Sequence, residues 1–395
     1  MPLITTRITA GQSATLKNSP LTNAEIDNNF ININNAIIAS QDVTGFPDRT
    51  TSTISWIDAT RTLTLTPVGG LTVFFRGAAY TISSAKTITI TNSSGGQFIY
   101  YDYTTDSLKD AGAAPNFATQ IVVAYIYWNS VDSKAVIIGD ERHQASRDTT
   151  WHGYQHNTIG TIWKSGGDAS YTVNNTNTVT LSIAGPVVIA DEDLDHTIVD
   201  SVSPANQFEQ TLSGPGNFPI LYLSGTNYRQ IDPTTVPWYP STTRAYYNQI
   251  SAGSGALATA TADNNYIVYW VVATNDTRYP IKLIMGRGEY SDYGSAETED
   301  FNAYNLSLPE IAPMYKIILQ TSSSFTGNTA RVKIAGVREL IGKQNARSNS
   351  FDTLSHNALS DRNLADQHSI ASITNLQTTL DSVAGASVAM AIALG

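Results

Sequence analysis

The pentapeptide TLTLT at residues 62–66 decides the fold class, because its apolar and polar side chains alternate with a period of two. Such alternation places the leucines on one face of a β-strand and the threonines on the other. The pentapeptide TITIT at residues 87–91 repeats the pattern. Both segments predict half-buried strands with a threonine face toward solvent.

Longer apolar runs extend this β pattern through the chain. Residues 121–128 and 135–138 predict a hairpin around 129–133, and residues 266–273 and 281–285 predict a second one. Gly286–Ser295 is predicted to be a loop. Further strands are predicted at 98–103, 178–183, 220–223, 315–320 and 331–335. We therefore predict an all-β fold with β-sandwich-like domains and short helices at both ends.

Changes in composition divide the chain into four parts. Residues 1–45 are predicted to be an N-terminal segment with a short helix, 46–145 a first β domain and 146–341 a second one. Residues 342–395 begin with the polar run GKQNARSNS and are predicted to be a linker and a helical module.

Charge and cysteine content exclude several classes of protein. Lys and Arg number 23 and Asp and Glu 33 among 395 residues, so the net charge is −10 and nucleic acid is not an expected partner. The absence of cysteine excludes disulfide frameworks, thiolate metal sites and a cysteine nucleophile. No apolar stretch is long enough to span a bilayer, so no membrane insertion is expected.

Each predicted terminal helix carries one apolar seam. Residues 22–25, TNAE, match a capping box that starts the first helix. Isoleucine at both seam positions favours trimers, whereas packing of each helix on its own β domain is the alternative that the pattern leaves open. The two seams consist of Ile26, Phe30, Ile33 and Ile37, and of Ile373, Leu376, Leu380 and Val383.

Two segments resemble motifs of tailed-bacteriophage structural proteins. Residues 20–34, PLTNAEIDNNFININ, resemble an N-terminal motif, L-T-N-x-E-[IVL]-D-x-N-F, that belongs to tail fibres and other appendages. Residues 356–376 resemble a fibre motif that precedes trimeric modules, although Ser369 and Asn375 replace its usual proline and glycine. The resemblance implies that attachment to the particle involves Leu21, Thr22, Asn23, Glu25, Asp27, Asn29 and Phe30.

This resemblance implies a structural virion appendage, a tail fibre or fibre-like homotrimer located on the particle. Its expected partners are copies of itself, other tail, baseplate or neck proteins, and a host-surface glycan or protein. Three copies would support adhesion by multivalency, with neither catalysis nor a cofactor. The alternatives are a head, neck or baseplate protein without a receptor role, and a tailspike-like glycan hydrolase.

Histidine and carboxylate clusters are the candidates for chemistry. His152 and His156 are four residues apart, the spacing of zinc ligands on a helix, and Asp140, Glu141 and His143 would complete a set of ligands. The favoured interpretation is that both are loop histidines with local hydrogen bonds, and no metal is expected. The segment Asp191–His196, DEDLDH, resembles the start of a calcium loop and is interpreted as an acidic turn in solvent.

A second acidic cluster offers carboxylates for glycan hydrolysis without any indication of their separation, so no catalytic residue is assigned. Its members are Glu289, Asp292, Glu297, Glu299 and Asp300. The proline-flanked Trp238 and Tyr239, with Tyr246 and Tyr247, are the candidates for a surface binding site, because exposed aromatic faces stack on sugars or proteins. The alternative is that Trp238 plugs the edge of its own domain.

Overall fold

The structure is a computed structural model that describes residues 4–6, 14–17, 19–41, 43–112, 115–117, 119–144, 154–155, 160–239, 243–301 and 310–341. Contacts divide the chain into a compact unit, Met1–Asn345, and a second unit, Ala346–Gly395, which lies outside the described residues. Strands dominate the described residues, which confirms the all-β class. No described helix is long and apolar enough to cross a membrane.

The N-terminal segment contains the short parallel strands β1 (Ile4–Thr6) and β2 (Ala14–Leu16) and the helix α1 (Asn23–Gln41). The predicted capping box is present, because the backbone N–H of Thr22 donates to Glu25 Oε2 at 2.7 Å and the N–H of Glu25 donates to Thr22 Oγ1 at 3.3 Å. Two free N–H groups of the first turn are thereby satisfied, which explains why α1 begins here.

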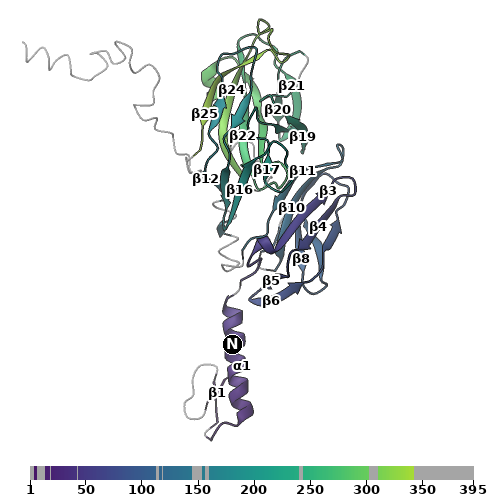
Figure 1. Cartoon of the computed structure of the whole chain (residues 1–395), viewed down its shortest axis with the longest axis vertical. Coiled ribbons are helices and arrows are strands. Elements are labelled where there is room, and N and C mark those ends of the chain that lie inside the picture. The colour runs from purple at the N-terminus through teal and green to yellow at the C-terminus, as the bar shows by residue number, and fades with distance from the viewer. Residues whose placement is uncertain are drawn as a thin grey trace, which may run out of the picture. The chain divides into compact units, whose positions relative to one another are not determined.

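Residues 49–140 form three small sheets, with strand orders β3-β4-β7, β5-β6 and β11-β10-β8-β9 (Figure 1). The predicted hairpin is β10 with β11, and the TLTLT segment is β4, whose two leucines are fully buried. The elements are η1 (Arg49–Thr51), β3 (Ser52–Ile57), β4 (Thr62–Pro67), β5 (Leu71–Phe75), β6 (Ala78–Ile82), β7 (Lys86–Thr89), β8 (Gly95–Asp102), β9 (Ser107–Gly112), β10 (Ile121–Asn129) and β11 (Lys134–Asp140).

Residues 161–339 form a six-stranded sheet, β19-β18-β23-β22-β24-β25, a four-stranded sheet, β12-β15-β16-β17, and two hairpins, β13-β14 and β20-β21. The elements are β12 (Thr161–Ser165), β13 (Ala169–Tyr171), β14 (Leu181–Ile183), β15 (Val187–Asp191), β16 (Leu194–Asp200), β17 (Glu209–Gln210), β18 (Phe218–Ser224), β19 (Asn227–Thr234), β20 (Tyr246–Ser251), β21 (Ser254–Thr259), β22 (Asn265–Thr274), β23 (Ile281–Tyr290), α3 (Tyr293–Glu297), β24 (Ile311–Thr321) and β25 (Val332–Glu339).

The predicted loop Gly286–Ser295 is wrong over most of its length. Strand β23 continues to Tyr290, which pairs with Tyr266 of β22, and α3 begins at Tyr293. The strand continues because the neighbouring strand β22 offers backbone partners along this stretch, although the apolar side chains end at Met285.

The described residues form three apolar cores, and neighbouring residues of one strand belong to different cores. The first core contains Leu63 and Ile126, the middle core contains Tyr125 and Trp270, and the last core contains Tyr269. Strands β10 and β22 are therefore buried on both faces, which explains why their sequences are continuously apolar instead of alternating. The middle core joins residues 46–145 to residues 146–341 within one compact unit, and the division of that unit into two domains stays a prediction.

Candidate functional site

The seam of α1 is exposed in the chain. The exposed fractions are 40% for Ile26, 69% for Phe30 and 41% for Ile33, and Ile31 beside them is 55% exposed. Lys17 forms an ion pair with Glu25 at the start of this helix. The side chain of Ile37 and the whole C-terminal seam from Ile373 to Val383 lie outside the described residues. Within the part of α1 whose side chains are described, the chain itself leaves the seam largely uncovered.

The predicted surface site at Trp238 is wrong, because Trp238 is only 3% exposed and belongs to the last core. The backbone N–H of Tyr239 donates to Tyr269 Oη at 3.0 Å, and that hydroxyl donates to the carbonyl of Tyr246 at 2.7 Å. Tyr239, Tyr246 and Tyr247 are half-buried. Burial of the large apolar ring outweighs the tendency of a proline-flanked loop to lie at the surface, so Trp238 packs into the core of its own region.

A buried cluster of carboxylates and histidines gathers residues from distant parts of the chain. Glu141 and His143 follow β11, Asp191 ends β15, Asn275 follows β22, and Glu310 precedes β24. All five side chains are at least nine-tenths buried. The interpretation of Asp191–His196 as a turn in solvent is therefore wrong for Asp191, which is fully buried because the β15–β16 hairpin directs its side chain inward.

An arginine balances the charge of Asp140 at the edge of this cluster. Arg142 donates from Nε to Asp140 Oδ1 and from Nη2 to Asp140 Oδ2, both at 2.7 Å. The third nitrogen of Arg142 donates to Ser52 Oγ at 2.8 Å and to the carbonyl of Arg49 at 3.0 Å. Although burial by itself raises the pKa of Asp140, Arg142 and its hydrogen bonds hold that pKa well below the usual range. Asp140 therefore adds no uncompensated charge.

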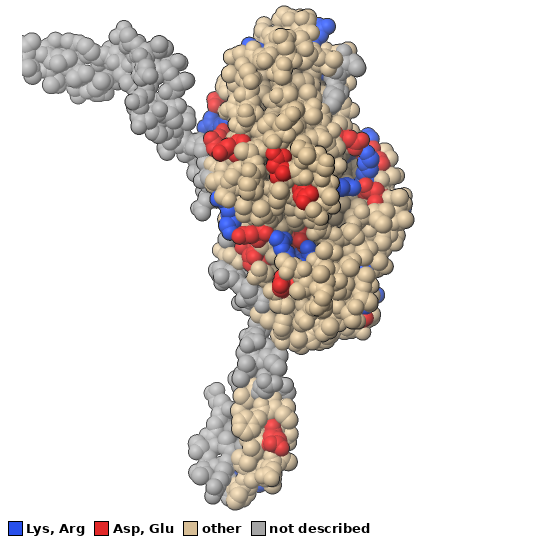
Figure 2. Space-filling model, viewed as in Figure 1, with Lys and Arg blue, Asp and Glu red and all other residues tan. Residues whose placement is uncertain are grey.

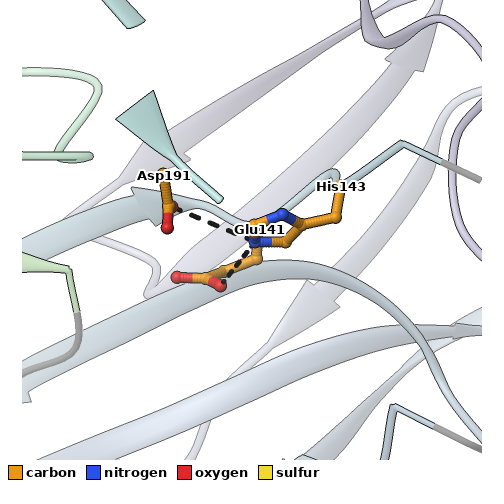
Figure 3. Close-up of side chains that lie close together, drawn as sticks. All are labelled: Glu141, His143 and Asp191. Atoms are coloured by element: carbon orange, nitrogen blue, oxygen red, sulfur yellow. Dashed lines mark ion pairs between the residues drawn. The ribbon is translucent and has the colours of Figure 1, made fainter. Parts of the chain in front are cut away.

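Four carboxylates surround His143, one of them Glu192, whose Oε2 lies 4.0 Å from Nδ1. Its Nδ1 lies 2.9 Å from Asp193 Oδ1, whereas its Nε2 lies 3.6 Å from Glu141 Oε2 and 3.9 Å from Asp191 Oδ2. Figure 3 shows Glu141 and Asp191 pointing toward the same ring nitrogen. Burial lowers the pKa of His143, but the nearby carboxylates of Asp193 and Glu141 raise it, and the net pKa lies well above 6.5.

Asp191 also faces a second group of carboxylates. Its ligand-type oxygens and those of Glu192 and Glu310 lie within 4.8 Å of one another. The hydroxyl of Thr161 donates to Glu310. Burial, and next the charge of Glu310, raise the pKa of Asp191 well above the usual 3.8. Like charges this close in a buried place require protons or a cation.

The second acidic cluster does not form one site among the described residues. Glu289 accepts from the backbone N–H groups of Thr261 and Ala262, and Asp292 caps α3. Glu297 pairs with Arg338, and Glu299 accepts from Trp270 and Tyr290. The carboxylates thus bind separate structural partners, and the structure gives no support to a paired acid and base there.

The remaining candidates are two histidines before β12 and the last two residues of the segment Asp191–His196. His152 and His156 lie outside the described residues. Asp195 is exposed and pairs with Lys164, whereas His196 is fully buried with its Nδ1 3.0 Å from Arg49 Nη1. Comparison of the chain with family models, curated proteins and solved structures finds no match.

Proposed function

We propose that the chain is a structural appendage of a tailed-phage particle, assembled as a homotrimer through the seam of α1 and attached through its N-terminal segment. The observation that carries the proposal is the exposure of Ile26, Phe30 and Ile33 on one stripe of a capped helix. Burial of such side chains stabilises by about 1.5–3 kcal/mol each, so their exposure in a single chain favours association.

The spacing and identity of these residues support three copies. Ile26, Phe30, Ile33 and Ile37 recur at intervals of four, three and four residues, which is the heptad pattern. Ile26 and Ile33 occupy one seam position and Ile37 the other, and isoleucine at both positions favours trimers. Asn, a weak helix former, is the most frequent residue of α1 outside the seam, so the helix needs a partner for its stability.

The rest of the described chain suits a passive role. Figure 2 shows a face that is mostly uncharged, with small separate groups of acidic and basic side chains. Strands β10 and β22 have apolar cores on both faces, which favours a scaffold rather than a hinge. Adhesion to a host-surface glycan or protein would then depend on three weak contacts acting together, without catalysis.

Sedimentation velocity of the full chain tests the assembly. We expect three times the 42.6 kDa chain mass for the wild type, and dissociation toward the monomer for Phe30→Asp, which places a charge in the seam. Asn28→Asp adds the same charge at an exposed position outside the seam and is expected to remain trimeric. A monomeric wild type, or equal dissociation of both variants, would contradict the proposal.

Antibody-gold labelling of phage particles that carry the chain tests the location. Label on fibres or at the tail tip is expected for an appendage with a role in adhesion. Label confined to the head or collar would contradict adhesion, and unlabelled particles would contradict the virion role.

A further inference from the structure

We propose that Glu141, His143 and Asp191 bind a divalent transition-metal ion such as Zn²⁺ or Mn²⁺, and that Asp193 is the positioning residue for His143. The site goes beyond the proposed assembly and does not depend on it. Its three ligands come from the ends of β11 and β15, so a bound ion would tie together two sheets of the compact unit.

The geometry of the three side chains fits one small ion. A candidate ligand atom from each side chain lies within 4.8 Å of those of the other two, and Nε2 of His143 is 3.6 Å from Glu141 Oε2 and 3.9 Å from Asp191 Oδ2. Neighbouring ligands of a tetrahedral ion with bonds of about 2.1 Å lie roughly 3.4 Å apart. The two distances from His143 Nε2 exceed this value by only a few tenths of an ångström, and the ligand oxygens of Glu141 and Asp191 lie within 4.8 Å of each other.

A buried carboxylate oxygen points independently to a ligand. Glu141 Oε2, which lies 3.6 Å from His143 Nε2, has no hydrogen-bond donor among the described residues, although Glu141 is completely buried. Nδ2 of Asn275 donates to the other oxygen of Glu141, Oε1, at 2.9 Å, and to Asp191 Oδ2 at 3.2 Å. One amide thus orients both carboxylates. A buried carboxylate oxygen without a donor is costly unless a cation or a proton satisfies it.

The orientation of His143 has the form found in metal centres. Histidine ligands usually donate one ring N–H to a carboxylate and use the other nitrogen for the metal. Here Nδ1 is 2.9 Å from Asp193 Oδ1, and Nε2 faces Glu141 and Asp191. Asp193 therefore selects the tautomer in which Nε2 is the ligand atom.

The ligand types select the class of metal. Imidazole suits Zn²⁺ and other transition ions, whereas Ca²⁺ and Mg²⁺ prefer sites made of oxygen atoms alone. Glu192 and Glu310 each have a carboxylate oxygen within 4.8 Å of one of Asp191, and they add negative charge that a dication would offset. Glu141 and His143 also line a small pocket with Thr44 and Gln120.

Metal binding is measured on the full chain after removal of metals with a chelator. We expect isothermal titration calorimetry to show one Zn²⁺ per chain, and Zn²⁺ to raise the melting temperature. Asp191→Asn and His143→Gln are expected to lose both effects. Asp193→Asn is expected to weaken binding by about 10- to 100-fold, because it disturbs only the orientation of the imidazole.

The controls separate metal binding from folding. Asp232→Asn removes an exposed carboxylate that pairs with Lys134 and is expected to bind Zn²⁺ as the wild type does. Far-UV circular dichroism of the metal-free variants checks their fold. Asp191→Asn is expected to melt no earlier than the metal-free wild type, because it removes one of three carboxylates that crowd a buried place.

Three results would overturn the proposal. Wild-type chain without Zn²⁺ or Mn²⁺ binding would mean that protons alone satisfy the carboxylates. Binding of Ca²⁺ or Mg²⁺ in preference to both transition ions would exclude the imidazole as a ligand. Zn²⁺ binding that survives in folded Asp191→Asn and His143→Gln would place the ion elsewhere.

Discussion

The buried ion pair of Asp140 and Arg142 makes the sharpest prediction about stability. Asp140→Asn keeps the shape of the side chain but removes the charge that faces Arg142, whose side chain is only 4% exposed. Breaking a buried pair from one side costs about 3–5 kcal/mol, because the remaining charge stays buried without compensation. The hydrogen bonds from Arg142 to Ser52 and Arg49 hold the guanidinium in place, so it cannot turn toward solvent to escape this cost.

The expected change in melting temperature follows from the size of the unit. With an unfolding entropy of about 2 cal/mol/K per residue, a unit of this length has roughly 0.7 kcal/mol/K in total, so the loss corresponds to about 4–7 °C. Differential scanning calorimetry measures the shift. Asp232→Asn is the matched control, because its carboxylate is 74% exposed and an exposed ion pair contributes about 0–1 kcal/mol. Equal shifts for both variants would refute the reasoning that burial determines the cost.

Two further substitutions test the core and the contact between the two β regions. Trp238→Ala is expected to lower the free energy of unfolding by about 3–5 kcal/mol, because it leaves a cavity at a buried site. The control Val202→Ala, at a residue 90% exposed, is expected to change that free energy little. Equal effects of the two substitutions in urea unfolding would show that Trp238 is exposed. Asp58 accepts from Trp56, Ala135 and Arg278, and although burial raises its pKa, these partners hold it below 3.8. The ionised Asp58 therefore stabilises the fold above pH 3.8, and this stabilisation is lost as the pH falls through the pKa of the folded state. The difference in melting temperature between the wild type and Asp58→Asn should shrink from pH 7 to pH 3. A constant difference would contradict the role of the charge.

Local features of the fold were predictable because short-range physics decides them. The alternation at Leu63 and Leu65 identifies a strand with one buried face, and both side chains are fully buried. The hairpin of β10 and β11 follows from two apolar runs around a polar turn. The start of α1 follows from the capping box of Thr22 and Glu25, which needs only residues three apart.

The candidate metal site was not predictable in the same way. Sequence reasoning noted Asp140, Glu141 and His143 and, separately, the acidic segment beginning at Asp191, but it joined the first group to His152 and His156 and placed the second in solvent. No pattern of neighbouring residues indicates that the side chain of Asp191 points inward or that Asn275 takes part. Asn275 is 134 residues from Glu141 along the chain.

By itself, the sequence determined the β class, the positions of the main hairpins and the beginning of the N-terminal helix, because residue periodicity and capping act within a few residues. Only the tertiary structure decided that Trp238 is buried and that Glu141, His143 and Asp191 meet. Those outcomes depend on which faces of distant strands pack together, and packing is settled by the burial of the whole apolar surface rather than by neighbours in the chain.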